Sequence, residues 1–392
     1  MSNLVVLEGS GVISALGCGV KPNLQGLRKG LGLYHRVDLS GFNEVVSVPY
    51  LPVGIGQNSG AEERTHQLID SVLEEVFSNT NISAEHKLSM PIFIGSSSYG
   101  IGLGEELYRN ALISDISAIP LPLDGFTQVS KHLRRRHQML GADYAFNTAC
   151  TASANALLSA IKSIQQGHHP YALVLGIEAY NATTLSGFYG LQLLSGEQMR
   201  PFDKQRNGLV LGEGCAALLL KASVKSNQKL IFCGGASGCD TFSVSSSNPN
   251  GSSIAEVMHK ALADSNVSTK DILAIKAHGT ATLLNDEGEA AAMRQVFDSV
   301  PDFFSLKSYI GHTLGGCGAI ETALMAACLE SQLLPISAGF READKHLAIT
   351  PTTTPGIATS GHYMLNFFGF GGNNCSLIIK LPPHSKQSCL HA

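Results

Sequence analysis

The chain has 392 residues, of which 44% are hydrophobic and 15% charged, and its formal net charge is −4. This length and apolar content are enough for a large core, and for two halves of similar size. The small net charge argues against a general nucleic-acid binder. No run of eighteen apolar residues and no basic, apolar leader occur, so we expect no membrane span and no secretory signal. Nine cysteines without a CxxC pair indicate reduced thiols and a cytoplasmic location.

Short β-rich runs alternate with helical patterns along the whole chain, which predicts an α/β fold with parallel or mixed sheets covered by helices. The predicted strands are Asn3–Gly9, Met90–Ser97, Asp143–Ala149, Tyr171–Ala179, Ala216–Ala222, Lys229–Ser237, Asp271–Gly279, Asp302–Ser308, Tyr363–Gly372 and Cys375–Leu381. The predicted helices are Glu62–Phe77, Ala152–Gln166, Ser252–Asp264, Asp286–Val296 and Ala319–Gln332. The polar segment Lys221–Lys229 predicts a boundary between an N-terminal half, residues 1–225, and a C-terminal half, residues 226–392.

Cys150 lies in the stretch AFNTACTASANALLSAIK, directly before a helix of small and apolar residues. The unpaired N–H groups and the positive dipole end of a helix N-terminus favour a thiolate, as a catalytic nucleophile requires. Free cysteine is also among the most buried residue types. Position alone therefore leaves two interpretations open, a nucleophile and a structural core cysteine.

Two histidines occupy similar strand-to-helix junctions. His278 follows a predicted strand in KAHGTAT, and His312 lies in the glycine-rich turn of YIGHTLGGCG. The ends of strands are where α/β sheets build their sites. An imidazole near a helix N-terminus tends to stay neutral and can donate one hydrogen bond. Each histidine taken alone is as compatible with a structural role.

The turn NFFGFGGNN (Asn366–Asn374) combines aromatic residues with Gly369, Gly371 and Gly372. Glycine permits positive φ and close approach of the backbone. Such a turn is suited to aim an N–H group at a developing oxyanion. A plain tight hairpin between two strands is the alternative.

Taken together and in this order, five segments resemble the elongating β-ketoacyl-acyl-carrier-protein synthases of the thiolase fold. The resemblance covers nearly the whole chain. It rests on TACTAS around Cys150, RPFDKQRNGLVLGEG (Arg200–Gly214), HGTAT (His278–Thr282), KSYIGHTLGGCGAIE (Lys307–Glu321) and FGFGG (Phe368–Gly372). The family fold is a duplicated α/β half that gives a five-layered αβαβα core, usually in a dimer.

The resemblance implies a role for each matching residue. Cys150 would accept the acyl chain from a carrier-protein thioester. His278 and His312 would hold the malonyl thioester carbonyl and stabilise the enolate that forms on decarboxylation. Lys307 and Glu321 correspond to a buried charged pair that orders the surroundings of His312, and such a pair requires that each charge has its partner.

Further implied roles concern the turn and the substrate arm. The backbone N–H groups of Cys150 and Phe370 would form the oxyanion hole, and Phe370 would also be the aromatic gate for acyl chains. Thr280 and Thr282 correspond to hydroxyls that hydrogen-bond the phosphopantetheine arm of acyl carrier protein. No permanently bound cofactor is implied, because substrates arrive on that arm.

The pattern separates neighbouring families. Chain-initiating synthases pair cysteine and histidine with an asparagine, where this chain has His312. Thiolases use a cysteine close to the C-terminal glycine turn, whereas Cys375 lies beyond FFGFGG in a predicted strand. No cluster in the sequence has metal-ligand spacing, so we predict no metal site. A nucleotide-binding interpretation of GSSSYGIGLGEE (Gly95–Glu106) fails because its glycines are not in a GxGxxG register.

Three positions depart from the usual family pattern. Asn207 stands where aspartate is common, Leu283 where proline is common, and Phe367 where serine or alanine is usual. None touches the expected chemistry, but a bulky Phe367 beside the gate turn could reshape the acyl pocket. The pathway therefore stays open between fatty-acid elongation and specialised polyene or polyketide assembly, for example of the aryl-polyene type.

Non-catalytic relatives, the chain-length factors, shape the cavity of a partner synthase and lack the nucleophile cysteine. A chain-length-factor-like subunit of a heterodimer is the alternative function, and the retained cysteine argues against it. The expected partners are acyl carrier protein and a second subunit, in a homodimer or a heterodimer with a chain-length factor. For docking of the acidic carrier protein, the candidates are Arg200 and the basic run KHLRRRH (Lys131–His137). No nucleic acid or membrane is expected as a partner.

Overall fold

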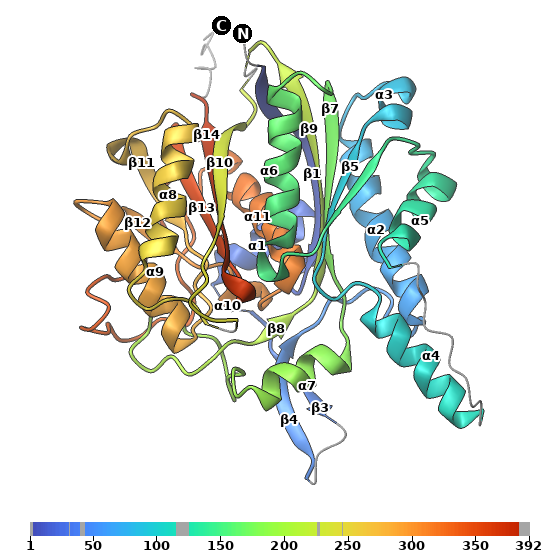
Figure 1. Ribbon diagram of the computed structural model, residues 1–392, viewed down its shortest axis with the longest axis horizontal. Helices are drawn as coiled ribbons and strands as arrows, with labels where there is room; N and C mark the ends of the chain where they lie inside the picture. Colours follow the sequence, from blue (N-terminus) through green and yellow to red (C-terminus); the bar gives the residue numbers. More distant parts are fainter. Residues whose placement is uncertain are drawn as a thin grey trace, which may run out of the picture.

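The computed structural model describes residues 3–30, 32–39, 44–114, 125–225, 228–244 and 246–383. In these ranges a mixed sheet of eleven strands runs through the molecule in the order β12-β11-β13-β14-β10-β1-β9-β7-β5-β6, with β2 paired to β1 (Figure 1). One part of the sheet contains β1 (Leu4–Ser14), β2 (Gly17–Cys18), β5 (Ile92–Gly95), β6 (Asp143–Phe146), β7 (Tyr171–Glu178) and β9 (Gly214–Ser223). The other contains β10 (Ile231–Cys239), β11 (Ile272–Lys276), β12 (Asp302–Phe304), β13 (Gly361–Phe368) and β14 (Asn373–Leu381).

The two parts of the sheet have the same topology. From their junction outward, the strands run β1-β9-β7-β5-β6 on one side and β10-β14-β13-β11-β12 on the other, so each set visits its strands in the same chain order. The first two pairings of each set are antiparallel and the last two are parallel. The sets join where Val5 and Val6 of β1 pair with Phe232 and Ile231 of β10. This repeat is the duplicated α/β arrangement of the thiolase fold.

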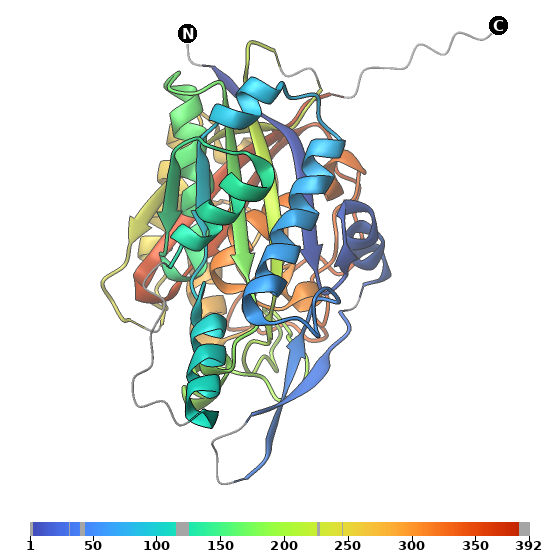
Figure 2. The same ribbon diagram turned by 90° about the vertical axis from the view of Figure 1, so that its right-hand side faces the viewer.

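Helices form three layers around these two sets of strands, and Figures 1 and 2 show the layers in two views. The central layer consists of α6 (Ala152–Gln165) and α11 (Cys317–Glu330), which pack against each other, with α1 (Val20–Lys29) beside α11. The outer layers consist of α2 (Ala61–Ser78) and α5 (Thr127–His137) on one side, and α8 (Ser252–Asp264) and α9 (Leu283–Val296) on the other. The fold class predicted from the sequence, a five-layered αβαβα core, is confirmed.

The hydrophobic pattern explains the layers. In β9, Ala216, Leu218 and Leu220 face the central helices, while Cys215, Ala217 and Leu219 face the outer layer, as the period of two in a strand dictates. All of α11 from Cys317 to Leu329 is buried, as expected for a helix covered on every side. A Cβ on Gly318 of α11 would lie 2.1 Å from the backbone nitrogen of Ala154 in α6, so only glycine permits this contact.

The remaining elements cover the end of the sheet that carries the motifs (Figure 1). They are α4 (Ile101–Ile113), α7 (Ala182–Gly190), α10 (Lys307–Ile310), the 3-10 turns η1 (Ala149–Thr151), η3 (Leu314–Gly316) and η4 (Phe370–Gly372), and a small sheet of β3 (His35–Leu39), β4 (Val46–Leu51) and β8 (Leu211–Gly212). Two further elements are α3 (Ala84–Ser89) and η2 (Thr269–Asp271).

Every predicted strand and helix is present, with bounds that differ by a few residues. The helix α5 contains the basic run. The helices α4 and α7 and the small sheet were not predicted from the sequence. The boundary predicted after residue 225 stays a prediction, and residues 226 and 227 lie outside the described ranges. Among the described helices, none combines the length and the apolar character needed to cross a bilayer.

Candidate functional site

One cavity of about 470 Å³ brings the predicted site residues together from both parts of the sheet. Cys150 reaches it from η1 at the start of α6, His278 from the loop after β11, and His312 from the turn before η3. The same lining contains Thr280, Thr282 and Phe370. These residues lie far apart in sequence, and the fold gathers their side chains around one cavity.

Three of the turns that carry these residues contain a non-glycine residue with positive φ. Ala149 precedes Cys150 with φ 50°, Ala281 lies in the HGTAT turn with φ 63°, and Leu314 follows His312 with φ 40°. Such conformations cost energy and persist only where the surroundings fix them, and they concentrate at functional sites. The strain is thus located at the segments that present the cysteine and the two histidines.

The Cys150 thiol is almost completely buried. Burial raises its pKa to about 11, although a backbone hydrogen bond from Phe370 and the charge of Lys307 act in the opposite direction. The helix N-terminus was expected to favour a thiolate, and this expectation does not hold for the free protein, because desolvation is the larger effect. Cys150 is therefore a neutral thiol at pH 7 before a substrate binds.

The two histidines are buried side by side, with ring centroids 5.3 Å apart and ring planes nearly perpendicular. Burial and the nearby charge of Lys307 hold the pKa of both rings well below the usual value, so both are neutral at pH 7. The Nδ1 atom of neither ring hydrogen-bonds to any described residue. A pair of neutral imidazoles can offer one N–H donor each to an oxygen between them.

Buried carboxylates hold the two histidine turns in place. Glu289 of α9 accepts hydrogen bonds from the backbone nitrogens of His278 and Gly279, both at 2.8 Å. Asp286 accepts from Thr280 at 3.1 Å, and Glu178 of β7 accepts from Gly315 at 2.9 Å in the turn after His312. Burial raises the pKa of Asp286 to about 6 and of Glu289 to about 7. The sequence analysis did not identify these positioning residues, because their partners are backbone groups.

A buried cluster of three charged residues lies behind the histidines. Lys307 Nζ is 2.6 Å from one oxygen of Glu321, which confirms the predicted contact, and Lys276 Nζ is 2.7 Å from the other oxygen. All three side chains are completely buried. Burial and repulsion by Lys307 lower the pKa of Lys276, whereas Glu321 raises the pKa of Lys307 above its ordinary value. Glu321 therefore forms an ion pair with each lysine through a different carboxylate oxygen.

Lys276, which the sequence did not single out, accounts for the bulky side chain of Phe367. The Lys276 ammonium lies 3.6 Å from the centroid of the Phe367 ring and 2.5 Å from the Asn366 carbonyl oxygen. Phe367 is completely buried in the central core and does not line the Cys150 cavity. The Phe367 ring is thus the partner of a buried lysine, and the effect of Phe367 on the acyl pocket or the gate stays a prediction. A lysine ending an otherwise apolar strand was the available signal.

The charge arrangement predicts an order of stability among variants of this cluster. Glu321→Gln leaves two buried lysines without a counter-charge and should cost about 3–5 kcal/mol of unfolding free energy. Lys276→Met keeps the ion pair between Lys307 and Glu321 and should cost no more than about 1–3 kcal/mol, the penalty for an unpaired carbonyl. Urea unfolding followed by circular dichroism measures both. Equal losses for the two variants would contradict this assignment of the charges.

The glycine turn lies against the nucleophile. The Phe370 ring stacks on Phe188 of α7, with centroids 5.6 Å apart. A Cβ on Gly369 would lie 3.1 Å from the Cys150 backbone nitrogen, so the close approach favours glycine. Thr280 and Thr282 hydroxyls are 2.9 Å apart in the wall of the same cavity. The turn therefore brings the Phe370 amide to the sulfur of Cys150. A plain hairpin, the alternative that the sequence left open, would not require this contact.

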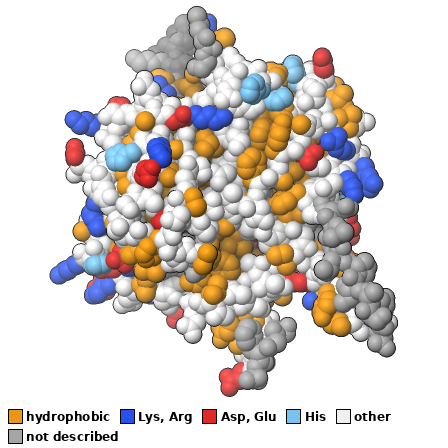
Figure 3. Space-filling model, in the orientation of Figure 1, with side chains coloured by type: hydrophobic (Ala, Val, Ile, Leu, Met, Phe, Trp, Pro, Cys, Tyr) orange, Lys and Arg blue, Asp and Glu red, His pale blue; other side chains and the backbone are white. Residues whose placement is uncertain are grey.

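Two of the sequence departures and the docking candidates have defined places. Asn207 and Leu283 both line the Cys150 cavity, and Leu283 is exposed at its rim. Arg200 lies in a separate surface hollow with Arg36 and Arg341. The basic run forms α5 on the outer layer, on the other side of the sheet from α6, and Figure 3 shows its Lys and Arg side chains at the edge of the molecule. Neither docking candidate lines the Cys150 cavity.

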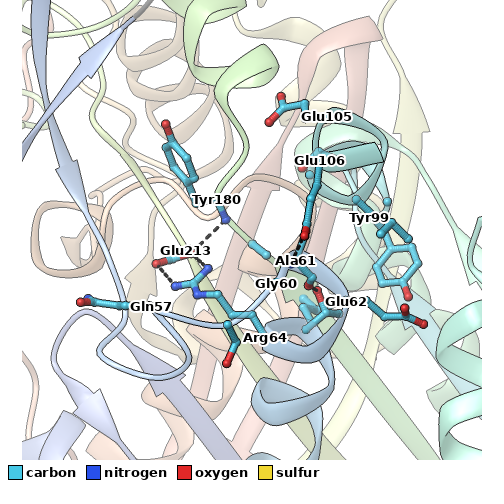
Figure 4. A pocket seen from close by; sticks show the side chains of 18 of the residues that line it. Gln57, Gly60, Ala61, Glu62, Arg64, Tyr99, Glu105, Glu106, Tyr180 and Glu213 are labelled. Carbon is cyan, nitrogen blue, oxygen red and sulfur yellow. Dashed lines mark hydrogen bonds and ion pairs between the residues drawn. The ribbon is translucent and has the colours of Figure 1, made fainter. Parts of the chain in front are cut away.

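A larger cavity, of about 700 Å³, lies between α2, α4 and the end of β7 (Figure 4). Its charged groups bind one another: Arg64 Nη1 lies 2.6 Å from Glu213, which also accepts from the Tyr180 amide at 2.9 Å. Glu106 accepts from the Ala61 amide at 2.7 Å. Among the described residues that line this cavity, none is a cysteine or a histidine. We therefore assign the chemistry to the smaller cavity.

Comparison with known proteins identifies the family of this chain. Residues 57–226 fit the model of the beta-ketoacyl synthase N-terminal domain, and residues 231–341 fit that of the C-terminal domain. The putative mitochondrial 3-oxoacyl-[acyl-carrier-protein] synthase of Schizosaccharomyces pombe is 28% identical, over 96% of this chain and 98% of that protein. The 3-oxoacyl-[acyl-carrier-protein] synthase 2 of Rhizobium meliloti is 27% identical, with the same coverage.

Solved structures share the fold over nearly the whole chain. The ketosynthase ApeO, in complex with its chain length factor ApeC, from Xenorhabdus doucetiae superposes with a TM-score of 0.83 at 24% identity, covering 97% of this chain and 98% of that one. The ishigamide ketosynthase/chain length factor gives a TM-score of 0.84 at 25% identity, with 97% and 99% covered. With two domain models in sequence and relatives that align end to end, this chain belongs to the beta-ketoacyl synthase family.

Proposed function

We propose that this protein catalyses the decarboxylative Claisen condensation of an acyl chain, held on Cys150, with malonyl-acyl carrier protein to give 3-oxoacyl-acyl carrier protein. The observation that carries the proposal is the convergence of one thiol and two neutral imidazoles on a single cavity. Carbon–carbon bond formation of this kind needs a nucleophile that holds the acyl group and donors that stabilise an enolate.

In the first half-reaction, the Cys150 sulfur attacks the acyl thioester carbonyl, and the carrier-protein thiol leaves with the proton that Cys150 gives up. The pKa of about 11 means that this proton has to leave as the thioester is attacked. The amides of Cys150 and Phe370 are the candidate donors to the tetrahedral oxyanion, because the Phe370 amide is already directed to the sulfur.

In the second half-reaction, malonyl thioester loses carbon dioxide, and the electron pair of the broken bond forms an enolate. His278 and His312 donate N–H groups to its oxygen, and their neutrality leaves each with the one proton required. The enolate carbon then attacks the acyl-Cys150 carbonyl, and the Cys150 thiolate leaves. Lys307 and Glu321 act as positioning residues for the His312 turn.

Both substrates would arrive on the phosphopantetheine arm of acyl carrier protein, and no permanently bound cofactor is needed. Thr280 and Thr282 are suited to hydrogen-bond this arm, because their hydroxyls line the cavity. The Arg200 hollow, with Arg36 and Arg341, is the better docking site for an acidic carrier, since the histidines of the basic run on α5 turn inward.

The pathway and the second subunit are part of the same proposal. Similar structures include ketosynthases with their chain length factors, and a type II polyketide ketosynthase in complex with acyl carrier protein. These relatives support specialised polyene or polyketide assembly, for example of the aryl-polyene type. They also support a heterodimer as an alternative to a homodimer. Primary fatty-acid elongation is supported by the relatives named 3-oxoacyl-[acyl-carrier-protein] synthase. A chain-length-factor-like, non-catalytic role is disfavoured by the retained Cys150.

The experiment that tests the function offers the protein a panel of acyl-carrier-protein thioesters with malonyl-acyl carrier protein. Intact-mass analysis follows the acyl adduct on the protein and the 3-oxoacyl product on the carrier, with and without a co-expressed chain length factor. We expect both species for at least one chain length. Neither species under any of these conditions would refute the enzymatic function and favour the non-catalytic alternative.

A further inference from the structure

The inward face of α5 carries a histidine cluster that the proposed reaction does not use. His132 Nε2 and His137 Nε2 each lie 2.6 Å from the same oxygen, Oδ1, of Asp70 in α2. The contacts join residues 62 and 67 positions apart and link the two outer helices, which lie next to each other in Figure 2. The three side chains are largely but not completely buried, so the cluster is accessible to small solutes.

The spacing of these atoms suits a single metal ion. All three donor atoms lie within 4.8 Å of one another. An ion held tetrahedrally at bond lengths of about 2 Å separates its ligand atoms by roughly 3.3 Å. The two contacts of 2.6 Å would therefore have to lengthen by only roughly 0.7 Å, which small side-chain rotations provide.

The chemistry of the groups also favours a metal. Two imidazoles and one carboxylate are the ligands of catalytic and open zinc sites, in which solvent takes the fourth position. The three ligand atoms already meet at one point, because both histidine Nε2 atoms contact Oδ1 of Asp70. Arg136 lies 3.9 Å from the other oxygen of Asp70 and leaves Oδ1 to the histidines.

We propose that Asp70, His132 and His137 bind one divalent transition-metal ion of the zinc class, which links α5 to α2. The His66 ring stacks on His132 at 3.9 Å between centroids and fixes the orientation of that ligand. The positive charges of Arg136 and Lys87 near the cluster lower its affinity for a cation. The site lies on the outer layer, separated by the sheet from α6, so it is independent of the Cys150 cavity.

Spectroscopy with cobalt as the probe tests the site directly. We expect tag-free protein to bind one equivalent of Co²⁺ with the visible bands of a four-coordinate ion, and without the charge-transfer band that a cysteine ligand would add. Zn²⁺ should displace the cobalt and raise the thermal unfolding midpoint. Binding should weaken as the pH falls, because protons compete with the metal for the imidazole nitrogens.

The variants H132N, H137N and D70N should each lose this equivalent of cobalt and the stabilisation by zinc. D70N keeps the size and shape of the side chain, and circular dichroism checks that each variant is folded. H346N is the matched control, because His346 pairs with Glu287 at 2.9 Å and has no third ligand there. Unchanged binding in H132N and D70N, or equal loss in H346N, would overturn the proposal.

Discussion

Cys150→Ala is expected to abolish both the acyl adduct and the condensation, with the rate falling by more than roughly 10³-fold, the scale on which removal of a catalytic nucleophile acts. The reason is that no other thiol of the described chain lines the Cys150 cavity. Decarboxylation of malonyl-acyl carrier protein should survive in part, since His278 and His312 remain in place. Intact-mass analysis of the protein and of the carrier measures all three quantities.

Cys375→Ala is the matched control for this experiment. Cys375 is completely buried in β14, just beyond the glycine turn, and does not line the Cys150 cavity. The Cys375→Ala variant should become acylated on Cys150 at the wild-type rate. An adduct that persists in Cys150→Ala, or one that disappears in Cys375→Ala, would contradict the assignment of the nucleophile.

The raised pKa adds a second readout for Cys150. With a pKa of about 11, the thiolate fraction at pH 7 is small and increases tenfold with each pH unit up to that value. Alkylation of the Cys150 peptide by iodoacetamide should therefore accelerate about tenfold per unit between pH 7 and pH 10. A rate that levels off near pH 7 would indicate a thiolate that is stabilised in the free enzyme.

The sequence was sufficient to predict the elements that are defined by local patterns. The strands β7 and β9 are continuous apolar runs, and α6 begins at the change from a strand to small residues. The strand pattern and the helix pattern could therefore both be recognised in the sequence. By contrast, only Leu185 of α7 is buried, and a helix with so narrow an apolar face gives no periodic signal. The strands β3 and β8 of the small sheet also give little signal, because β3 buries only Leu39 and β8 has only two residues.

At the site, the sequence identified the groups that face the cavity and the pair Lys307 and Glu321, but not the carboxylates that hold the turns. Cys150 and His278 stand out because each follows a strand and precedes a helix. In the structure α10 lies between β12 and His312, so His312 stands out only by its glycine-rich turn before a helix. Glu289 and Asp286 bind backbone amides, and any acidic residue early in a helix looks the same in a sequence. The pair Lys276 and Phe367 needs a contact between two strands, β11 and β13, which only their register supplies.

The metal-ligand cluster shows the same limit. The sequence contained no ligands with metal-binding spacing, because Asp70 and the histidines come from two helices whose contact depends on tertiary packing. The basic run KHLRRRH looked uniform in the sequence, but the period of the helix places its residues on two different faces of α5. His132 and His137 turn toward α2, while Lys131 and the arginines are exposed. The division makes the inward histidines available to a metal and leaves the outward cations as a solvated face.

Removal of either histidine donor should have the second-largest effect. His278→Ala and His312→Ala should each slow malonyl decarboxylation and condensation by roughly 10²–10³-fold, as loss of one oxyanion donor does. Transfer of the acyl chain to Cys150 should continue in both variants, because the amides of Cys150 and Phe370 are unchanged. His278→Gln, which keeps an N–H donor, should recover part of the rate, and His346→Ala is a control at a histidine that does not line the cavity.

The pH profile distinguishes neutral from charged histidines. Both rings have a pKa well below 6.5, because burial and the charge of Lys307 disfavour the imidazolium. Neither ring changes its protonation between pH 6.5 and 8, whereas Glu289, which holds the His278 turn, has a pKa of about 7. The wild-type decarboxylation rate should therefore follow only the ionisation of Glu289 over this range and be flat above about pH 8. Acetyl-acyl carrier protein, measured by mass at fixed times, reports that rate. Wild-type condensation by both alanine variants would remove the histidines from the mechanism.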